Sequence, residues 1–270
     1  MITRFAPSPT GPLHLGHALS AITAHDAARA AGGTFLLRIE DLDQSRCRPE
    51  YEAGIFDDLA WLGLTWDGPV WRQTDRTAAY ANTLRQLDQL GLIFPCQCRR
   101  ADILAAYTGD PPFGPDGILY PGTCRHRSMA DRAPQDAVRL DMAKAVQQID
   151  PVTFREGDQI VACDDLTSKV GDVVLARRDS GAAAYHLACI VDDAAQGVTH
   201  VIRGLDLFEA TQIHVVLQQL LGLPTPNYQH HRLITDENGK RLAKRHDSKA
   251  IAKFRQEGLS PANIRQMIGL

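Results

Sequence analysis

The stretch RFAPSPTGPLHLGHAL, residues 4–19, places three prolines, two glycines and two histidines between an apolar strand and a plain helix. This layout is typical of a phosphate site, because a helix N-terminus offers unpaired N–H groups and partial positive charge. Gly11 and Gly16 allow the backbone to approach a ligand closely. His14 and His17 lie three residues apart and therefore share a helix face. We expect both imidazoles to donate to a nucleoside triphosphate; the alternative is a proline-rich loop with two ordinary surface histidines.

The composition is that of a globular protein with a sizeable core. The chain has 270 residues, of which 44% are apolar and 23% charged, enough for one large domain or two smaller ones. No apolar run approaches the length of a membrane span, and the N-terminus leads into prolines rather than into a signal peptide. We therefore expect a cytoplasmic protein that contacts no membrane. The formal net charge is -3, so a polyanionic partner would need a local basic patch.

Strands and helices alternate in the first part of the chain. GGTFLLRIE, residues 32–40, is an apolar strand that ends on a carboxylate. Residues 49–64 form a predicted helix with Pro49 in its first turn. A second helix is predicted over residues 78–92, with an apolar face of Tyr80, Leu84, Leu87 and Leu90. The alternation predicts an α/β fold with a parallel, Rossmann-like sheet.

The character of the chain changes between about residues 94 and 170, where short segments rich in proline and glycine predict an inserted subdomain. Residues 182–223 are predicted to form a strand, a loop, a second strand and a long amphipathic helix. A hairpin at Asn238-Gly239 and a helix starting at Ser260-Pro261 are expected near the C-terminus. The predicted domains are a catalytic domain (1–93 and 171–225), the inserted subdomain (94–170) and a C-terminal segment with a short helical part (226–270).

Three of the six cysteines, Cys96, Cys98 and Cys124, lie within 29 residues. A cytosolic chain of this length needs no disulfide framework, so the cluster indicates a metal site, and the alternative is three thiols that bind no metal. The other three cysteines are expected to be buried thiols. Structural zinc takes four ligands in a tetrahedron. On general chemistry the fourth ligand is His126, two residues after Cys124. The zinc ion would stabilise an insertion that has little core of its own.

Two motifs at opposite ends of the chain carry a family resemblance. PSPTGPLHLGH, residues 7–17, resembles the HIGH signature of class I aminoacyl-tRNA synthetases in the version used by glutamyl enzymes. KRLAKRHDS, residues 240–248, resembles the KMSKS signature, with Arg241 and Lys244 at its basic positions. Ala243 departs from the pattern, because the family often has a serine there. The resemblance implies that Lys244 stabilises the triphosphate during adenylate formation.

The residues themselves suggest how an amino acid is chosen. The planar fork of Arg4 matches a side-chain carboxylate, and Glu40 ends a strand near the edge where ligands of α/β proteins bind. The resemblance implies a glutamate site formed by Arg4, Phe5, Ala6, Pro7, Ser8, Glu40, Tyr185 and Arg203. It implies an ATP site formed by Pro7, Gly11, His14, Gly16, His17, Arg241, Lys244 and Arg245, of which His14, His17 and Lys244 are catalytic. It points to Tyr120 rather than His126 as the fourth zinc ligand, in a C-x-C…Y-x3-C pattern.

The reaction implied by the resemblance is attack of the glutamate α-carboxylate on ATP, assisted by Mg²⁺, to give glutamyl-adenylate and pyrophosphate. Only 25 residues follow Arg245, where full glutamyl-tRNA synthetases carry further helical domains that read the anticodon. The chain therefore resembles their short paralogues, the glutamyl-Q tRNA(Asp) synthetases. Those enzymes activate L-glutamate without tRNA and attach it to queuosine at the wobble position of tRNA(Asp).

Two other functions stay open at this point. One is the catalytic part of a conventional glutamyl-tRNA synthetase that charges tRNA(Glu). The other is a non-catalytic RNA-binding module, although such a module has no reason to keep both signatures. In the preferred reading, basic residues of the KMSKS-like segment contact RNA phosphates, and the protein is expected to be a monomer.

Overall fold

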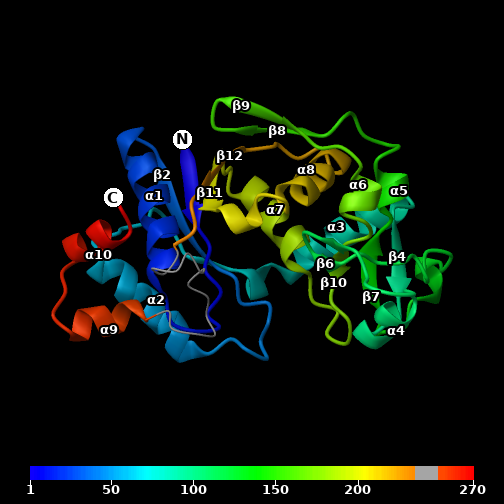
Figure 1. The fold of residues 1–270 in the computed structure, drawn as a ribbon, viewed down its shortest axis with the longest axis horizontal. Helices are drawn as coiled ribbons and strands as arrows, with labels where there is room; N and C mark the ends of the chain where they lie inside the picture. Colours follow the sequence, from blue (N-terminus) through cyan, green and yellow to red (C-terminus); the bar gives the residue numbers. More distant parts are fainter. Residues whose placement is uncertain (235–248) are drawn as a thin grey trace. The chain divides into compact units, whose positions relative to one another are not determined.

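The computed structural model describes residues 1–234 and 249–270 (Figure 1). Outside the described residues lie the Asn238-Gly239 turn and the basic positions of the KMSKS-like segment, Lys240, Arg241, Lys244 and Arg245. Among the described helices, none combines the length and the apolar character that crossing a membrane requires. The cytoplasmic location stays a prediction.

Two compact units make up the chain, each assembled from separate stretches of sequence. The first unit comprises Met1–Asp75, Val198–Asp206 and Pro226–Leu270, and the second comprises Arg76–Gly197 and Leu207–Thr225. The second unit thus interrupts the sequence of the first unit twice. The domain borders expected from composition stay predictions.

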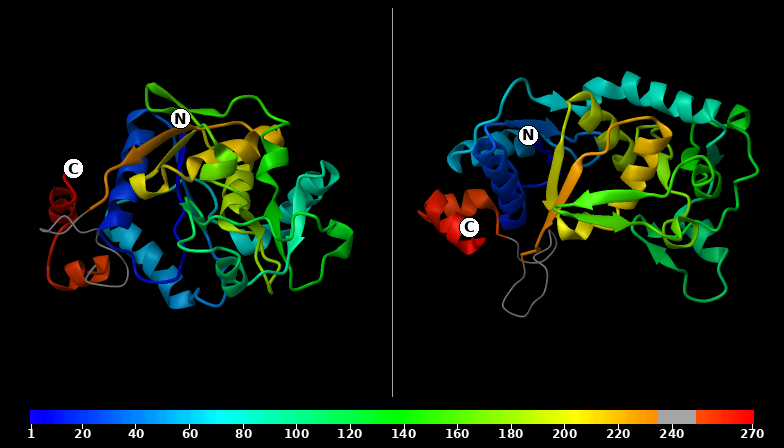
Figure 2. Two further views of the ribbon diagram at one scale, coloured as in Figure 1. Left: turned by 45° about the vertical axis from the view of Figure 1, so that its right-hand side comes forward. Right: turned by 90° about the horizontal axis from the view of Figure 1, so that it is seen from above.

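The first unit is built on a parallel sheet, as the alternation of strands and helices predicts. Strands β1 (Ile2–Phe5), β2 (Thr34–Ile39) and β3 (Trp71–Arg72) pair in that order, and all run parallel. Strands β11 (His200–Gly204) and β12 (Asn227–His231) form a second parallel pair (Figure 2). The backbone N–H of Thr199, just before β11, donates to the carbonyl of Ile2 at 3.0 Å, so β11 lies beside β1. The α/β prediction is confirmed.

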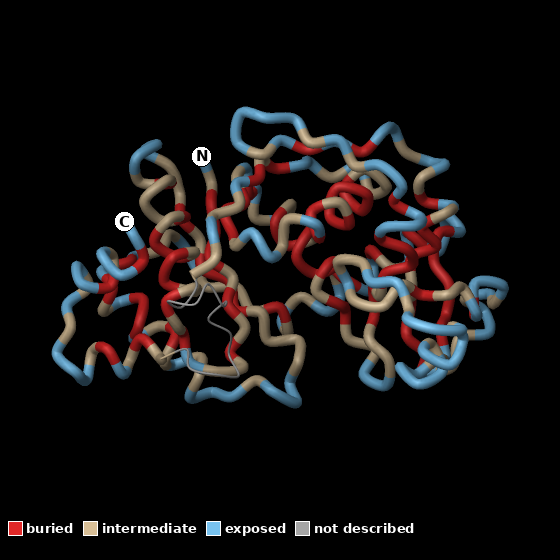
Figure 3. Tube along the Cα trace, in the orientation of Figure 1, coloured by how far each residue is buried: buried red, intermediate tan, exposed pale blue. Residues whose placement is uncertain are grey.

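Four α-helices lie in the described part of the first unit. They are α1 (Leu15–Ala30), α2 (Pro49–Trp61), α9 (Ile251–Gln256) and α10 (Pro261–Met267). Helix α1 packs against β1, β2 and β11, and its apolar side chains form the core with those of the strands. Figure 3 colours the trace of each unit by how far its residues are buried. The predicted helix start at Ser260 is confirmed, because its hydroxyl accepts from the N–H of Asn263 at 3.3 Å.

The second unit contains an antiparallel sheet of β10 (Val174–Ala176), β7 (Ala137–Leu140) and β4 (Ile93–Cys96), in that order. Its longer helices are α3 (Thr77–Gln89), α7 (Tyr185–Ala195) and α8 (Thr211–Leu220). Its short helices are α4 (Arg100–Ala105), α5 (Met142–Ala145) and α6 (Leu166–Lys169). Two hairpins are formed by β5 (Phe113–Gly114) with β6 (Gly117–Ile118) and by β8 (Thr153–Glu156) with β9 (Gln159–Ala162).

Two local expectations are wrong. The first part of residues 182–223, expected to be a strand, is helix α7. Seven of its eleven residues are buried, so the helix has little exposed face, and a short apolar run without an amphipathic pattern cannot be distinguished from a buried strand by periodicity. Leu90, expected on the apolar face of the helix over 78–92, is 46% exposed because α3 ends at Gln89.

Candidate active site and metal cluster

The turn between β1 and α1 is held by backbone hydrogen bonds from two neighbouring elements. The N–H of Glu40, which follows β2, donates to the carbonyl of Pro7 at 3.0 Å. The N–H of Arg48, the residue before α2, donates to the carbonyl of Pro9 at the same distance, 3.0 Å. The proline-rich turn is therefore fixed at the carboxyl edge of the sheet, where α/β folds bind ligands.

His14 and His17 lie together at the start of α1, with ring centroids 3.8 Å apart. His14 caps the helix: its Nδ1 accepts from the N–H of Gly16 at 3.1 Å, and its own N–H donates to Nδ1 of His17 at 3.1 Å. Because both Nδ1 atoms accept, each neutral imidazole carries its proton on Nε2. A Cβ at position 16 would lie 3.0 Å from Cε1 of His14 and would therefore press on the capping imidazole.

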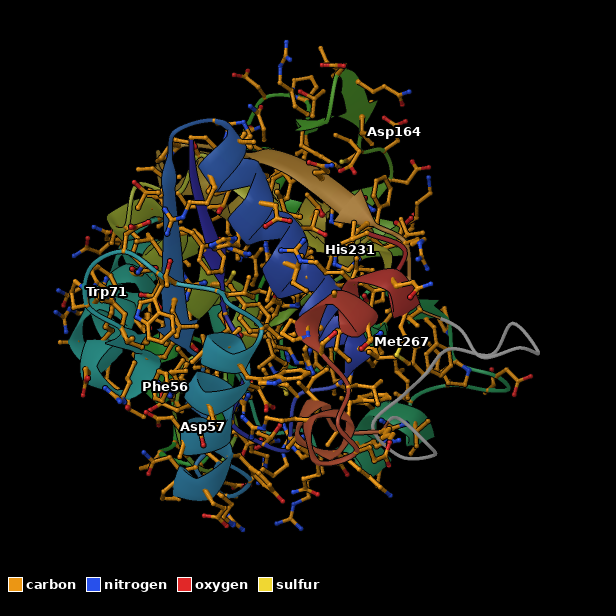
Figure 4. All side chains as sticks on the ribbon, turned by 90° about the vertical axis from the view of Figure 1, so that its left-hand side faces the viewer. Phe56, Asp57, Trp71, Asp164, His231 and Met267 are labelled. Carbon is orange, nitrogen blue, oxygen red and sulfur yellow. The ribbon has the colours of Figure 1, made fainter. Side chains whose placement is uncertain are left out.

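The residues on both sides of the KMSKS-like segment contact α1 or the residues just before it. After the segment, the N–H of Ile251 donates to the carbonyl of Leu13 at 2.8 Å, and Ala250 forms a β-bridge with His14. Before the segment, Nε2 of His231 at the end of β12 lies 2.7 Å from Oγ of Ser20 on α1 (Figure 4). The described residues that flank the segment therefore lie near the start of α1 and the predicted phosphate turn.

The predicted glutamate residues are divided between the units. Arg4 on β1 and Arg203 on β11 are buried, and Arg203 donates from Nε to Nε2 of His230 at 3.1 Å. Glu40 lies 3.5 Å from Nη2 of Arg38, whose side chain is wholly buried. Phe5 to Ser8 form the end of β1 and the start of the turn, whereas Tyr185 belongs to the second unit.

Sequence reasoning did not single out Arg38, although an arginine in the apolar strand LLRI was a visible signal. A buried charge is costly unless it is paired, and Arg38 is paired with Glu40. Arg38 therefore places a positive charge beside the Glu40 carboxylate. The sequence also offered no indication that His14 would cap α1, because histidine is not among the usual capping residues.

The three clustered cysteines converge in the second unit. The sulfurs of Cys96, Cys98 and Cys124 all lie within 4.8 Å of one another. The hydroxyl of Tyr120 is 3.4 Å from Sγ of Cys96 and 3.4 Å from Sγ of Cys98, and it accepts from the N–H of Cys124 at 2.9 Å. His126 is exposed and makes no described contact with the cluster, so the geometry favours Tyr120 beside the sulfurs.

The chemistry of these donors fits a thiophilic divalent cation. Burial raises the pKa of Cys98 to about 11, so in the absence of a cation this thiol stays protonated at neutral pH. A zinc ion reverses that preference, because coordination deprotonates the thiol. Of the remaining cysteines, Cys189 is buried as expected, whereas Cys47 and Cys163 are only partly covered.

A cavity of about 490 Å³ lies beside the cysteine cluster within the second unit. Its wall includes the ring of Tyr120, over which the guanidinium of Arg139 lies 4.2 Å from the centroid. The arginines in its lining are Arg99, Arg100, Arg139, Arg177 and Arg178. They outnumber the lining acids, Asp116, Asp172 and Asp179. The cavity therefore favours anionic ligands.

Comparison with protein families matches residues 1–270 to a family described as tRNA synthetases class I (E and Q), catalytic domain. The chain belongs to this family. The chain is similar to a protein of Rhodobacter capsulatus named glutamyl-Q tRNA(Asp) synthetase, which is 56% identical over 279 residues and aligned along 100% of both chains. A protein of the same name from Nitratidesulfovibrio vulgaris is 43% identical, over 97% of this chain and 83% of its own length.

The solved structures similar to this synthetase-family chain include a glutamate tRNA ligase from Elizabethkingia meningosepticum in complex with its amino acid. The TM-score is 0.78 at 27% identity. The match covers 99% of this chain but only 60% of that ligase. The class I synthetase fold predicted from the two signatures is confirmed.

Proposed function

We propose that this chain activates L-glutamate with ATP in the absence of RNA and transfers the glutamyl group to queuosine at the wobble position of tRNA(Asp). The observation that carries the proposal is the 56% identity, along the full length of both chains, with the Rhodobacter capsulatus protein of that name. The paired imidazoles at the start of α1 support the activation step. A monomeric state stays a prediction.

In the proposed ATP site, Nε2–H of His14 and of His17 face the triphosphate and the charge that develops at the α-phosphorus. Their Nδ1 atoms are already engaged, which orients both rings before ATP binds. The hydrogen bond between Ile251 and Leu13 supports a common site for the two signatures, because it returns the chain to the phosphate turn. We assign Pro7, Gly11 and Gly16 to the backbone wall of this site, and Arg241, Lys244 and Arg245 to triphosphate contacts. Mg²⁺ accompanies ATP as part of the substrate.

In the proposed glutamate site, buried Arg4 and Arg203 supply the positive charge that a dicarboxylic amino acid requires. Glu40 accepts from the substrate ammonium group, and Tyr185 donates its hydroxyl. Phe5, Ala6, Pro7 and Ser8 shape the wall. A site with two buried cations discriminates against an uncharged side chain, because only a carboxylate offers a guanidinium charge-assisted, bidentate hydrogen bonds.

In the proposed metal site, Cys96, Cys98, Cys124 and Tyr120 bind one structural zinc ion, and His126 is the alternative fourth ligand. The ion stabilises the second unit rather than the chemistry of the phosphate turn. The nearby arginine-lined cavity and the basic KMSKS-like segment supply contacts for the phosphates of the RNA.

The test has two stages. Glutamate-dependent exchange between ATP and pyrophosphate is first measured without RNA, and exchange is expected. Labelled glutamate is then offered with tRNA(Asp) that carries or lacks queuosine, and only the modified tRNA is expected to be labelled. Exchange that strictly requires tRNA(Glu) supports the conventional synthetase, and no exchange under any condition supports the RNA-binding module. Equal labelling of both forms of tRNA(Asp) excludes the modified base as acceptor.

A further inference from the structure

The second unit buries two histidines that the proposed reaction does not use. His186, in the first turn of α7, and His214, on α8, are 6% and 1% exposed. Nδ1 of His186 lies 3.1 Å from Nε2 of His214, which is a hydrogen bond between two imidazoles. Burying a polar ring is costly unless its nitrogens are hydrogen-bonded, and the bond between the two rings offsets part of that cost.

The pair is anchored at one end by an acid near the surface. Oδ1 of Asp116, in the turn between β5 and β6, lies 3.3 Å from Nε2 of His186, and the Asp116 side chain is 38% exposed. An ionised carboxylate only accepts, so Nε2 of His186 carries the proton. In the tautomer with its only proton on Nε2, His186 accepts at Nδ1 from Nε2–H of His214. The carboxylate thus sets the direction of both hydrogen bonds.

The same two imidazoles contact Tyr185. Its ring centroid lies 5.2 Å from that of His186, with the planes at 64°, and 5.5 Å from that of His214, with the planes at 51°. The orientation of the Tyr185 ring therefore depends on the orientation of both imidazoles. These orientations depend in turn on the hydrogen bonds that begin at Asp116.

We propose that Asp116, His186 and His214 form a positioning chain that holds Tyr185 in the orientation required for glutamate. The three are positioning residues, because they act on the substrate only through Tyr185. The inference rests on the proposed role of Tyr185 in the glutamate site. It adds a determinant of glutamate affinity from the β5–β6 turn, which carries none of the residues of the proposed site.

The test substitutes Asp116, the exposed member of the positioning chain, because a change there does not disturb the core. Asp116→Ala removes the acceptor, Asp116→Asn keeps an oxygen that accepts from His186, and Asp110→Ala is a matched control at an exposed acid before the same hairpin. In glutamate-dependent exchange, Asp116→Ala is expected to raise the KM for glutamate about two- to tenfold, the effect of one lost hydrogen bond, with kcat and the KM for ATP unchanged. Asp116→Asn is expected to restore most of the affinity, and the control to match the wild type.

A purely structural role predicts a different pattern. Asp116→Ala would then lower the melting temperature or the active fraction while the KM for glutamate stays at its wild-type value, and that result overturns the proposal.

A second readout does not depend on activity. In protein with ¹³C-labelled tyrosine rings, the Tyr185 resonance, assigned with Tyr185→Phe, is expected to shift in Asp116→Ala and not in Asp110→Ala. An unchanged resonance overturns the proposal as well. Absence of exchange in the wild type would instead refute the proposed function. The shift of the Tyr185 resonance in Asp116→Ala would still show whether Asp116 affects the environment of Tyr185.

Discussion

Asp58 offers the sharpest test of the physical reasoning about the first unit. It lies on α2 with 2% of its surface exposed, and its Oδ1 has no hydrogen-bond partner in the described part of the chain. Its nearest cation is Arg255 of α9, with Nη2 3.7 Å from that oxygen. Burial raises the pKa of Asp58 from 3.8 to about 6, Arg255 opposes the shift, and neighbouring Asp57 adds to it.

The sign of the effect on stability follows from this shift. The folded state binds the Asp58 proton more tightly than the unfolded state does, so stability falls as the pH rises from about 4 to 6 and then stays level. Above pH 6 the ionised carboxylate costs about 3 kcal/mol, because one pKa unit corresponds to about 1.4 kcal/mol. Asp58→Asn removes this cost. It also removes the contact with Arg255, which is a small loss because that side chain is 37% exposed.

We therefore expect Asp58→Asn to raise the free energy of unfolding by about 2–3 kcal/mol at pH 8 and by nearly nothing at pH 4. The assay is urea unfolding followed by tryptophan fluorescence, which reports on the first unit because Trp61, Trp66 and Trp71 all belong to it. The comparison variant is Asp57→Asn, an exposed neighbour on the same helix (Figure 4). It is expected to give only a small gain at pH 8, because the charge of Asp57 is the least of the three influences on the pKa of Asp58. A variant less stable than the wild type at pH 8, or a gain of equal size at both pH values, would refute the reasoning.

Three further outcomes are expected. Tyr120→Phe should lower the zinc content after dialysis against a chelator, whereas His126→Ala should retain the wild-type content; the reverse result would assign the fourth ligand to His126. Gly54→Ala should stabilise the protein by about 1 kcal/mol in the same urea assay, because Gly54 lies inside α2 and its added Cβ meets no atom within 4 Å. Lys244→Ala should lower kcat for activation much more than it raises the KM for glutamate, because its partner charge grows in the transition state; a raised KM with normal kcat would contradict this role.

Local backbone chemistry could be predicted from single stretches of sequence. Proline at the first position of α2 and the Ser260 cap of α10 act within one turn, so their effect does not depend on distant residues. The same holds for the entry from β1 through the proline-rich turn into α1. The prediction of a strand where α7 lies was wrong, because other elements pack around this helix and bury most of it. A helix without an exposed polar face lacks the pattern by which it is recognised.

In the candidate site, too, some features follow from local sequence and others depend on how distant elements pack. Spacing alone indicated a metal site, because Cys96 and Cys98 are two residues apart and Cys124 follows within the same predicted insertion. The sequence by itself thus determined the family, because each of the two signatures is a short run of neighbouring residues, and it predicted the phosphate turn and the thiol ligands. The tertiary structure places the hydroxyl of Tyr120, which the resemblance favoured over His126, beside the sulfurs. Only the tertiary structure decided that Ile251 returns to Leu13 and that His186 meets His214. These contacts depend on how separate elements pack, and packing is decided by the whole core rather than by any one segment.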